Sequence, residues 1–376
     1  MRVLMTGGGT AGHVNPALAI AATIQEKQPD AEILFAASAL PTDKAGDLVP
    51  RAGYPLQTVH IRGMARPIWT PSNLKLPFLM VRSLGEAGRI IDDFRPDLIV
   101  GTGGYACWPT CHAGIKKGIP TALHESNALP GRAIRRLKNR ADLLMVNFAE
   151  TLERLSMAEG GEGSRAVRVG NPIMPGFRQI SREDARERLG LSSTDLYVLA
   201  FGGSLGAEYV NDAVVKLAAE LTTAPHVKLT LAAGKRDYPR IRADWEQTPA
   251  GACARMELLE YIYDMPDRMA AADLVICRAG AMSISELALT GKASILIPSP
   301  NVADNHQFKN AMALVKEGAS ICVEESALSD GALTKQVVEL MEDSQKRREM
   351  GHLIRERFAC PDANERIYDH LMSLVR

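Results

Sequence analysis

The sequence predicts an α/β protein with two halves, each built around a parallel sheet. Short apolar runs alternate with amphipathic segments along the whole chain, which is the pattern of β-α units. The two halves also open alike. VLMTGGGTAGH near the N-terminus and YVLAFGGSLGA from Tyr197 both consist of an expected strand, a glycine-rich turn and a helix start, which indicates a duplicated architecture.

Each apolar run is expected to form one strand. In the first half the expected strands are residues 3–5, 33–35, 98–100, 121–123 and 143–146. In the second half they are residues 197–200, 227–231, 274–277 and 294–297. Ala17, Leu18, Ala21 and Ile24 recur at helical spacing after the first loop, so we expect that helix to pack on its sheet.

The boundary between the halves is expected in residues 170–176, where two prolines and two glycines oppose regular structure. We therefore expect one domain over residues 1–170 and a second over residues 171–357. The last helical stretch, residues 345–376, is interrupted by Cys360-Pro361. Such a break lets a final helix, residues 358–376, cross back onto the first domain.

The composition argues against several classes of protein. With 44 Lys+Arg against 44 Asp+Glu the chain has no basic excess, so no nucleic-acid partner is expected. Six cysteines are too few for a disulfide framework and fit a reduced intracellular protein whose thiols are buried and bind no metal. Neither a signal peptide nor a stretch of about 18 apolar residues occurs, so we expect neither export nor a membrane span.

The first glycine loop, GGGTAG at residues 7–12, formally matches the G-x-G-x-x-G phosphate loop between a strand and a helix. A nicotinamide enzyme would need an acidic residue at the end of the second strand to bind ribose hydroxyls. Residues 35–38 read Phe-Ala-Ala-Ser, so the dinucleotide interpretation loses most of its support. His13 follows the loop, where its imidazole either takes part in chemistry or only caps the helix.

Further loops are expected at the C-terminal ends of strands, where ligands of open α/β sheets bind. They are GTGGY at residues 101–105, HESN at 124–127, GGSLG at 202–206 and CRAGAMSISE at 277–286. In the last of these, helix N–H groups and serine hydroxyls suit a pyrophosphate, and Glu286 can accept both hydroxyls of a ribose. The alternatives are plain tight turns and a Glu286 side chain that only caps its helix.

Residues 304–307, DNHQ, precede an amphipathic helix and can either contact sugar hydroxyls or cap that helix. No Asp-x-Asp sequence occurs in the chain, which argues against a metal-bridged diphosphate. We therefore expect neither a metal ion nor another cofactor, and helix N-termini would have to stabilise the leaving diphosphate.

In order along the chain, GGGTAGHVNP, GTGGYA, HESN, GGSLGA, YIYDM, RAGAMSISE and DNHQ closely resemble the motifs of the MurG family of bacterial glycosyltransferases. The resemblance covers essentially the whole chain. It implies the GT-B fold, in which two Rossmann-like domains with parallel sheets face a central cleft. It also implies an inverting hexosyltransferase that moves N-acetylglucosamine (GlcNAc) from UDP-GlcNAc to the C4 hydroxyl of undecaprenyl-pyrophosphoryl-MurNAc-pentapeptide. That reaction converts lipid I to lipid II in peptidoglycan synthesis, on which cell shape and cell division depend.

The resemblance assigns site residues position by position. Ile262 is expected to meet uracil through its backbone, Glu286 the ribose and Gln307 the sugar. The other donor residues are Thr10, Ala11, Gly12, Asn127, Ser204, Ala281, Met282, Ser283, Ile284 and Ser285. The expected acceptor residues are Gly103, Gly104, Tyr105 and His124.

The general base that takes the proton of the acceptor hydroxyl is expected to be His13, with Glu125 as the second candidate. Two positions depart from the family pattern. Met174 stands where the family often has arginine, and His306 stands where some relatives have a second glutamine. Two other functions stay open: a hydrolysing UDP-GlcNAc 2-epimerase, which would need carboxylates around the sugar, and a non-catalytic UDP-sugar-binding subunit.

A lipid-linked acceptor requires an enzyme at the membrane surface. Apolar side chains crowd between Ile68 and Met80, where three prolines are expected to interrupt regular structure, and a basic run extends from Arg132 to Arg140. We expect these segments to bind the anionic cytoplasmic face of the bacterial cell membrane peripherally. The alternative is that the apolar side chains fill the core and the arginines form a solvated helix face.

Overall fold

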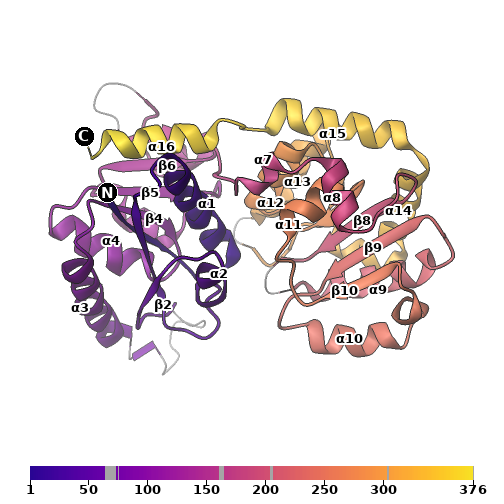
Figure 1. The fold of residues 1–376 in the computed structure, drawn as a ribbon, viewed down its shortest axis with the longest axis horizontal. Helices are drawn as coiled ribbons and strands as arrows, with labels where there is room; N and C mark the ends of the chain where they lie inside the picture. The colour runs from indigo at the N-terminus through magenta and orange to yellow at the C-terminus, as the bar shows by residue number, and fades with distance from the viewer. Residues whose placement is uncertain (64–72, 75, 161–164, 204–205, 303–304, 376) are drawn as a thin grey trace. The chain divides into compact units, whose positions relative to one another are not determined.

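The computed structural model describes residues 1–376 except 64–72, 75, 161–164, 204–205, 303–304 and 376. The chain divides into two compact units, coloured from indigo to yellow along the sequence in Figure 1. Unit 1 contains Met1–Pro175 and Asp362–Arg376, and unit 2 contains Gly176–Pro361. Each unit is an α/β structure with its own parallel sheet, as the sequence predicts.

The sheet of unit 1 has the strand order β3-β2-β1-β4-β5-β6-β7 in the described residues, with every neighbouring pair parallel. The strands are β1 (Arg2–Gly7), β2 (Glu32–Ser38), β3 (Leu56–Val59), β4 (Leu98–Gly103), β5 (Thr121–Glu125), β6 (Leu143–Val146) and β7 (Ala166–Arg168). Central strands are buried on both faces, and Leu4 of β1 pairs with Leu34 on one side and Ile99 on the other. Such strands are apolar throughout, which is why their runs are visible in the sequence.

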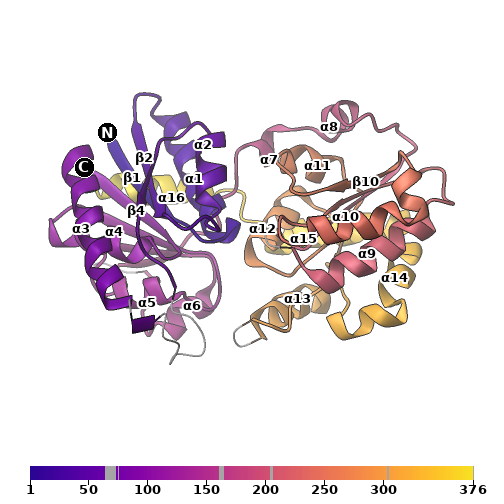
Figure 2. The same ribbon diagram turned by 90° about the horizontal axis from the view of Figure 1, so that it is seen from below.

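The helices of unit 1 form a layer on each face of this sheet. One layer contains α1 (Ala11–Lys27), α2 (Ala45–Arg51) and α16 (Ala363–Ser373). The other contains α3 (Leu76–Phe94), α4 (Cys107–Lys116) and α5 (Arg132–Leu137). Figure 2 shows the two groups on either side of the strands, and α6 (Ala149–Arg154) follows β6.

The start of α3 corrects one expectation. The segment up to Met80 was expected to be irregular because of its prolines, but α3 begins at Leu76. Pro77 lies in the first turn of this helix, where a proline gives up no helical hydrogen bond. Ile68 and Trp69 lie outside the described residues.

Unit 2 has the strand order β10-β9-β8-β11-β12-β13 in its described residues, again all parallel. The strands are β8 (Leu196–Phe201), β9 (Val227–Ala232), β10 (Met256–Leu259), β11 (Leu274–Cys277), β12 (Ser294–Leu296) and β13 (Ile321–Cys322). The helices are α7 (Gly176–Gln179), α8 (Arg182–Arg188), α9 (Glu208–Leu221), α10 (Tyr238–Glu246), α11 (Met265–Ala271), α12 (Ala281–Thr290), α13 (His306–Lys316), α14 (Ala332–Glu342) and α15 (Ser344–Phe358).

All the strands predicted from apolar runs are confirmed. The apolar runs did not predict β3, β7, β10 and β13, which are the edge strands of the two sheets in the described part of the chain. An edge strand has a neighbour on one side only and buries less of its surface, so it needs no continuous apolar run. In β3, for example, Gln57 and Thr58 are exposed.

Each sheet reverses its strand order at one place. In unit 1 the reversal lies between β1 and β4, which lead into α1 and α4 on opposite faces. In unit 2 it lies between β8 and β11, which lead into α9 and α12. The diverging loops at such a reversal leave a crevice at the C-terminal ends of the strands, where α/β proteins bind ligands. The glycine-rich segments of the sequence lie at these two reversals.

The end of the chain returns to unit 1. Helix α15 ends at Phe358, and α16 packs against α1 (Figure 1). Asn364 of α16 is buried; it accepts a hydrogen bond from the N–H of Ile173 at 3.0 Å and donates to the Ile173 carbonyl at 2.9 Å and to the Thr23 hydroxyl at 2.8 Å. One side chain therefore joins α16, α1 and the segment that leaves unit 1.

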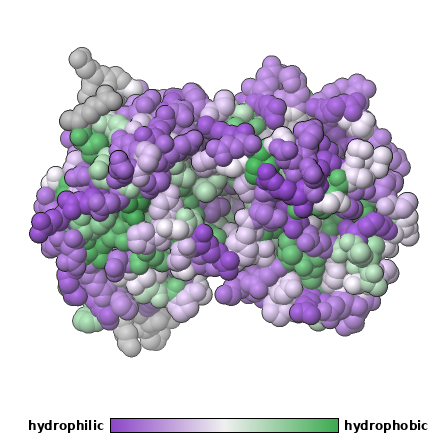
Figure 3. All heavy atoms as spheres, viewed as in Figure 1, coloured by the Kyte–Doolittle hydropathy of each residue, from purple (hydrophilic) through white to green (hydrophobic). Residues whose placement is uncertain are grey.

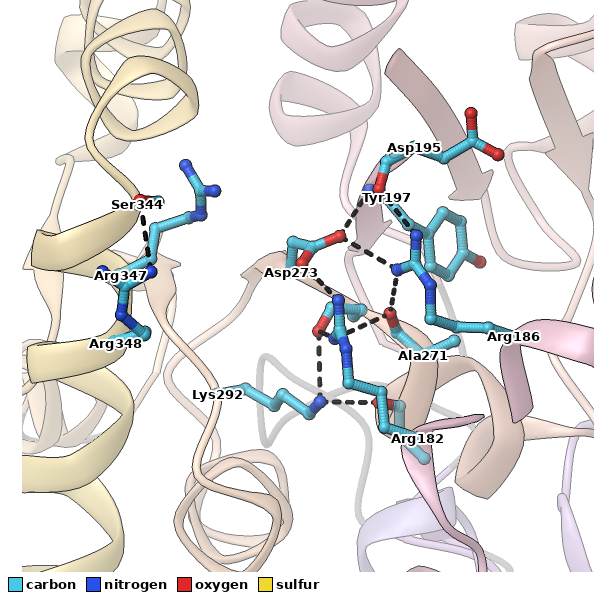
Figure 4. A network of polar contacts seen from close by, with 12 residues as sticks. Arg182, Arg186, Asp195, Tyr197, Ala271, Asp273, Lys292, Ser344, Arg347 and Arg348 are labelled. Atoms are coloured by element: carbon cyan, nitrogen blue, oxygen red, sulfur yellow. Dashed lines mark hydrogen bonds and ion pairs between the residues drawn. The ribbon is translucent and has the colours of Figure 1, made fainter. Parts of the chain in front are cut away.

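In unit 2, cationic side chains cap the C-terminal end of α11 (Figure 4). Arg182, Arg186 and Lys292 donate to the last carbonyl groups of this helix, those of Ala270, Ala271 and Ala272. Asp273 accepts from Arg182 at 2.5 Å and from Arg186 at 3.2 Å. Burial, and then the charge of Arg182, lower the pKa of Lys292 to about 7. The network complements the negative helix end and holds α8 against the start of β11.

Asn364→Ala should lower the free energy of unfolding by about 2–4 kcal/mol, because it leaves the buried N–H and carbonyl of Ile173 without their partner. Calorimetric unfolding measures the loss. Asn139→Ala, which changes an exposed asparagine, is the matched control and should stay within about 0.5 kcal/mol of the unmodified protein. Equal melting of the two variants would contradict this role of Asn364.

Candidate active site

The glycine loop between β1 and α1 is held by an acidic residue that the sequence analysis missed. The N–H of Gly9 donates to Oδ1 of Asp43 at 2.7 Å, and Asp43 is buried. Residues 35–38 contain no acidic residue, but Asp43 follows five positions beyond Ser38. Its carboxylate binds the glycine loop and not a ribose. The N–H groups of Ala11 and Gly12 have no recorded partner in the described part of the chain. An anion is therefore better met by the start of α1 than by the glycines.

His13 lies against the loop that follows β4. A Cβ built on Gly103 would be only 2.6 Å from Cδ2 of the His13 ring, and Gly103 has φ +106°, so only glycine fits here. The Thr102 hydroxyl donates to the His13 carbonyl at 2.7 Å, and Oγ1 of Thr10 lies 3.5 Å from Nδ1 of the ring. The half-buried imidazole is thus fixed between two loops at the strand-order reversal.

Gly104 and Tyr105 continue this contact. A Cβ on Gly104 would lie 2.2 Å from the Gly8 carbonyl oxygen, so the two glycine backbones touch directly. The ring of Tyr105 covers Gly63, and Tyr105 remains exposed. The structure therefore brings the predicted residues Thr10 to His13 and Gly103 to Tyr105 together at one edge of the sheet.

His124 and Glu125 of β5 are committed to internal contacts. The His124 ring is fully buried, and its Nε2 donates to the Gly170 carbonyl at 3.0 Å. Burial lowers the pKa of His124 to about 4, so the ring is neutral. The Glu125 carboxylate is buried too and accepts from the N–H of Asn127 at 3.0 Å, the amide of Asn127 at 3.1 Å and the N–H of Gly131 at 2.7 Å. In this conformation both side chains shape the loop that presents Asn127 and expose almost nothing to a substrate.

In unit 2 the RAGAMSISE segment forms the end of β11 and the start of α12. The N–H groups of Met282 and Ser283 have no recorded partner among the described residues, as expected in the first turn of a helix. The Ser285 hydroxyl donates back to the Ala281 carbonyl at 3.0 Å, so this bond already uses its proton. Ile284 is buried and faces the core. An anion here would be met by backbone N–H groups and Ser283.

Glu286 is a buried carboxyl group without a recorded hydrogen-bond partner in the described residues. It makes no bond back to the start of α12, so the capping interpretation does not apply. Burial raises the pKa of Glu286 to about 8. A carboxyl group in this state gains most from a ligand that offers hydroxyl donors, such as a ribose.

The segment before α11 carries Ile262, which is buried. Nε of Arg268 donates to both carboxylate oxygens of Asp264 at 3.0 Å, and Arg268 also donates to the Tyr197 hydroxyl at 3.2 Å. Glu257 of β10 completes this network around the guanidinium of Arg268. The network ties the Ile262 segment to the sheet, so that its backbone groups are presented in a fixed orientation.

The DNHQ segment leads into α13, which begins at His306. Oε1 of Gln307 accepts from the N–H of Ser299 at 2.9 Å, which leaves the amide nitrogen for a ligand. A cavity of about 430 Å³ lies beside this segment, lined in part by Asn305, Phe308 and Tyr209. Asp304 and the predicted donor residue Ser204 lie outside the described residues. Arg278 is paired with Glu325 and is not available to a phosphate.

The described residues offer neither a metal-binding cluster nor a helix that could span a membrane. No group of three or more His, Cys, Asp or Glu side chains is arranged to hold a metal ion. None of the described helices combines the length and the apolar character needed to cross a membrane.

Comparison with known proteins finds two domains of one glycosyltransferase family in this chain. The glycosyltransferase family 28 N-terminal domain matches residues 3–145, and the C-terminal domain of that family matches residues 197–367. The chain is 37% identical to the UDP-N-acetylglucosamine–N-acetylmuramyl-(pentapeptide) pyrophosphoryl-undecaprenol N-acetylglucosamine transferase of Acetivibrio thermocellus, over 100% of this chain and 99% of that protein. The transferase of the same name from Moorella thermoacetica is 36% identical over 93% of each chain.

Solved structures agree with this similarity. The crystal structure of Acinetobacter baumannii MurG has a TM-score of 0.67 and 26% identity, with 99% of each chain covered. A UDP-GlcNAc 2-epimerase from Neisseria meningitidis has a TM-score of 0.65 at 12% identity, covering 99% of this chain and 100% of that one. The second likeness shows a shared fold only.

Glu286→Gln should stabilise the protein more at about pH 9 than at about pH 5. The folded pKa of about 8 lies above the ordinary value of 4.5, so the folded state favours the protonated carboxyl. The unfolded chain loses this proton through its ordinary pKa, and stability therefore falls as the pH rises from there to the folded pKa. Glutamine does not ionise, so the variant should not lose this stability. Thermal unfolding of both proteins across the pH range measures the difference. Glu187→Gln, at an exposed glutamate, is the control, and a pH-independent effect of Glu286→Gln would contradict the burial argument.

Proposed function

The chain belongs to glycosyltransferase family 28, and we propose that it transfers GlcNAc from UDP-GlcNAc to the lipid-linked muramyl-pentapeptide of peptidoglycan synthesis. The feature of the site that carries the proposal is Glu286, a buried carboxyl without a recorded partner among the described residues. It lies in the helix α12, where the N–H groups of Met282 and Ser283 likewise have no recorded partner in the described part of the chain. A carboxyl group and a helix N-terminus at this spacing offer hydrogen bonds to a ribose and to a diphosphate together. Full-length relatives named as this transferase supply the identity of the sugar and the acceptor.

The reaction needs a base and a stabilised leaving group. The acceptor hydroxyl oxygen attacks the anomeric carbon of GlcNAc, the bond from that carbon to the diphosphate oxygen breaks, and UDP leaves with inversion. Helix N–H groups around Met282 and Ser283 are proposed to meet the charge that develops on UDP. Gln307 keeps an amide nitrogen for the sugar, and Ile262 offers its backbone to uracil.

His13 is the better candidate for the base. Its ring lies at the mouth of α1 and is partly exposed, whereas Glu125 is buried and already accepts three hydrogen bonds. Removing Glu125 from these donors would leave the N–H groups of Asn127 and Gly131 unpaired. We therefore assign proton removal to His13 and the shaping of the Asn127 loop to Glu125.

The rival functions fit less well. A 2-epimerase would need several carboxylates around the sugar. Of the two glutamates that line the cavity beside Gln307, Glu325 is paired with Arg278, which leaves the exposed Glu324. A binding subunit would not need the loops of unit 1, and relatives that are 37% and 36% identical over 100% and 93% of this chain are named as transferases.

We further propose that unit 1 binds the membrane that carries the acceptor, on its anionic cytoplasmic face. Leu74, which precedes α3, and Phe78 and Val81 in the first turns of α3 are exposed by 83%, 69% and 72%. Figure 3 shows hydrophobic residues gathered on unit 1 in the region of α3 and α4. Helix α5 adds the exposed Arg132, Arg135 and Arg136, and α4 packs against both α3 and α5. Apolar side chains beside arginines suit shallow insertion among anionic headgroups.

Release of UDP from UDP-GlcNAc should depend on added lipid-linked muramyl-pentapeptide and should persist in excess chelator. The proposed leaving-group stabilisation uses helix N–H groups and needs no metal ion. Mass spectrometry of the lipid product identifies the transferred sugar. UDP release without acceptor would favour hydrolysis, and strict dependence on added Mg²⁺ or Mn²⁺ would overturn the proposed stabilisation.

His13→Ala should lower turnover by roughly 10²–10⁴-fold, the usual effect of losing a positioned base, while the affinity for UDP changes little. His226→Ala, at an exposed histidine of unit 2, is the matched control. Glu125→Gln should mainly lower the melting temperature. Near-normal turnover of a folded His13→Ala protein would exclude His13 as the base.

Cosedimentation with vesicles rich in anionic lipid should show binding that weakens as the salt concentration increases. Each arginine near the surface should contribute about 1 kcal/mol to the free energy of binding at low salt. A Phe78→Ala, Val81→Ala double variant should bind less. Val338→Ala, at an exposed valine on α14, should bind as the unmodified protein does. Binding that is equal in all three proteins would exclude α3 from the docking surface.

A further inference from the structure

The turn after β2 contains a buried carboxylate satisfied by backbone N–H groups. Asp43 is 6% exposed; its Oδ1 accepts from Gly9 at 2.7 Å and Ala45 at 3.0 Å, and its Oδ2 accepts from Ser38 at 3.3 Å. The structure records no ion pair for Asp43 in the described residues. The Ala45 and Ser38 bonds are local, but the Gly9 bond joins two loops 34 residues apart.

Gly9 is held from both sides by this turn. Its N–H donates to Asp43, and its carbonyl accepts from the N–H of Lys44 at 3.4 Å. Gly9 has φ +86°. Glycine adopts positive and negative φ about equally well, so without these bonds the loop could take several conformations. A Cβ on Gly8 would lie 2.6 Å from Oδ2 of Asp43, so the carboxylate also packs directly under the preceding glycine. The bonds therefore select one conformation of the loop.

That conformation determines where His13 lies. Gly8 packs against Gly104 in direct backbone contact, and Gly103, the residue before Gly104, lies under the His13 ring. Gly9 is separated from His13 by a single turn of chain, in which the N–H of His13 donates to the Thr10 carbonyl at 3.0 Å. A shift of Gly8 and Gly9 would move the start of α1 and the seat of the imidazole together.

The charge of Asp43 also bears on what the loop does. In dinucleotide-binding folds the N–H groups of such a loop face a pyrophosphate. Here a carboxylate of the protein already takes the N–H of Gly9, and its negative charge would repel a phosphate at that place. The loop serves to orient the residues that follow it.

We propose that Asp43 is a positioning residue for His13, whose buried carboxylate holds the glycine loop in the conformation that seats the imidazole on Gly103. Asp43 itself touches no substrate. The inference rests on the proposed transferase function, in which His13 takes the proton of the acceptor hydroxyl. It assigns the main effect of Asp43 to kcat, while binding of the UDP part of the donor, which is proposed to depend on Ile262, Glu286 and α12 of unit 2, changes little.

Asp43→Asn keeps the shape of the side chain and one acceptor oxygen. It should lower kcat for acceptor-dependent UDP release by about 10–100-fold, because small misplacement of a catalytic group has effects of this size. The affinity for UDP, whose proposed contacts lie in unit 2, should change by less than about twofold. Asp47→Asn, at an exposed carboxylate of α2 that pairs with Arg51, is the matched control. Gly9→Ala disturbs the other end of the same bond and should give the same loss of kcat.

A double-variant cycle separates positioning from a general structural role. If Asp43 acts through His13, Asp43→Asn should cost no further turnover in a His13→Ala background. The same factor lost in both backgrounds would overturn the proposal, as would a normal kcat in both the Asp43→Asn and Gly9→Ala proteins.

The position of the His13 ring can also be followed without an activity measurement. The NMR resonances of the His13 ring should shift in Asp43→Asn and in Gly9→Ala, but not in Asp47→Asn. Unmodified protein without transferase activity would refute the proposed function, while the ring resonances would still decide whether Asp43 seats His13. Unchanged ring resonances in both loop variants would overturn the inference.

Discussion

The arrangement of this protein follows from a constraint on parallel sheets. Strands that are buried on both faces have no place for polar chemistry along their length, so functional groups collect in the loops at the C-terminal ends. The strand order reverses between β1 and β4 in unit 1 and between β8 and β11 in unit 2. The first reversal holds His13 and the second holds Glu286, so each unit contributes its chemistry from the same topological position.

Sequence patterns predict the centre of each sheet and fail at its edges. Interior strands such as β1 are apolar on both faces, whereas β3 and β7 are partly exposed and have no continuous apolar run. The site shows a similar division. Gly103 could be recognised because close packing demands glycine there, but Asp43 could not, because its partner Gly9 lies 34 residues away and only the folded chain brings them together. For the same reason, sequence motifs did not reveal that His124 and Glu125 are turned inward.

Buried charges in the described residues fall into two groups. Arg268 and Arg186 are surrounded by carboxylates and carbonyl groups, which is how proteins compensate the loss of water around an ion. Glu286 lacks any such recorded compensation and is held protonated by its surroundings near neutral pH. A local violation of the packing rules commonly marks a functional position. Here the violation fits a group whose partner is supplied by the ligand.

Helix α16 has a consequence for how the chain is made. Unit 1 contains residues from both ends of the sequence, whereas unit 2 is one continuous segment. As the chain leaves the ribosome, Ile20 and Ile24 of α1 emerge before unit 2, but the helix that covers them, with Ile367 and Leu371, is synthesised only after unit 2. Unit 1 therefore completes its fold only after the whole of unit 2 has been translated, and its apolar α1 surface is the part that chaperones would have to protect until then.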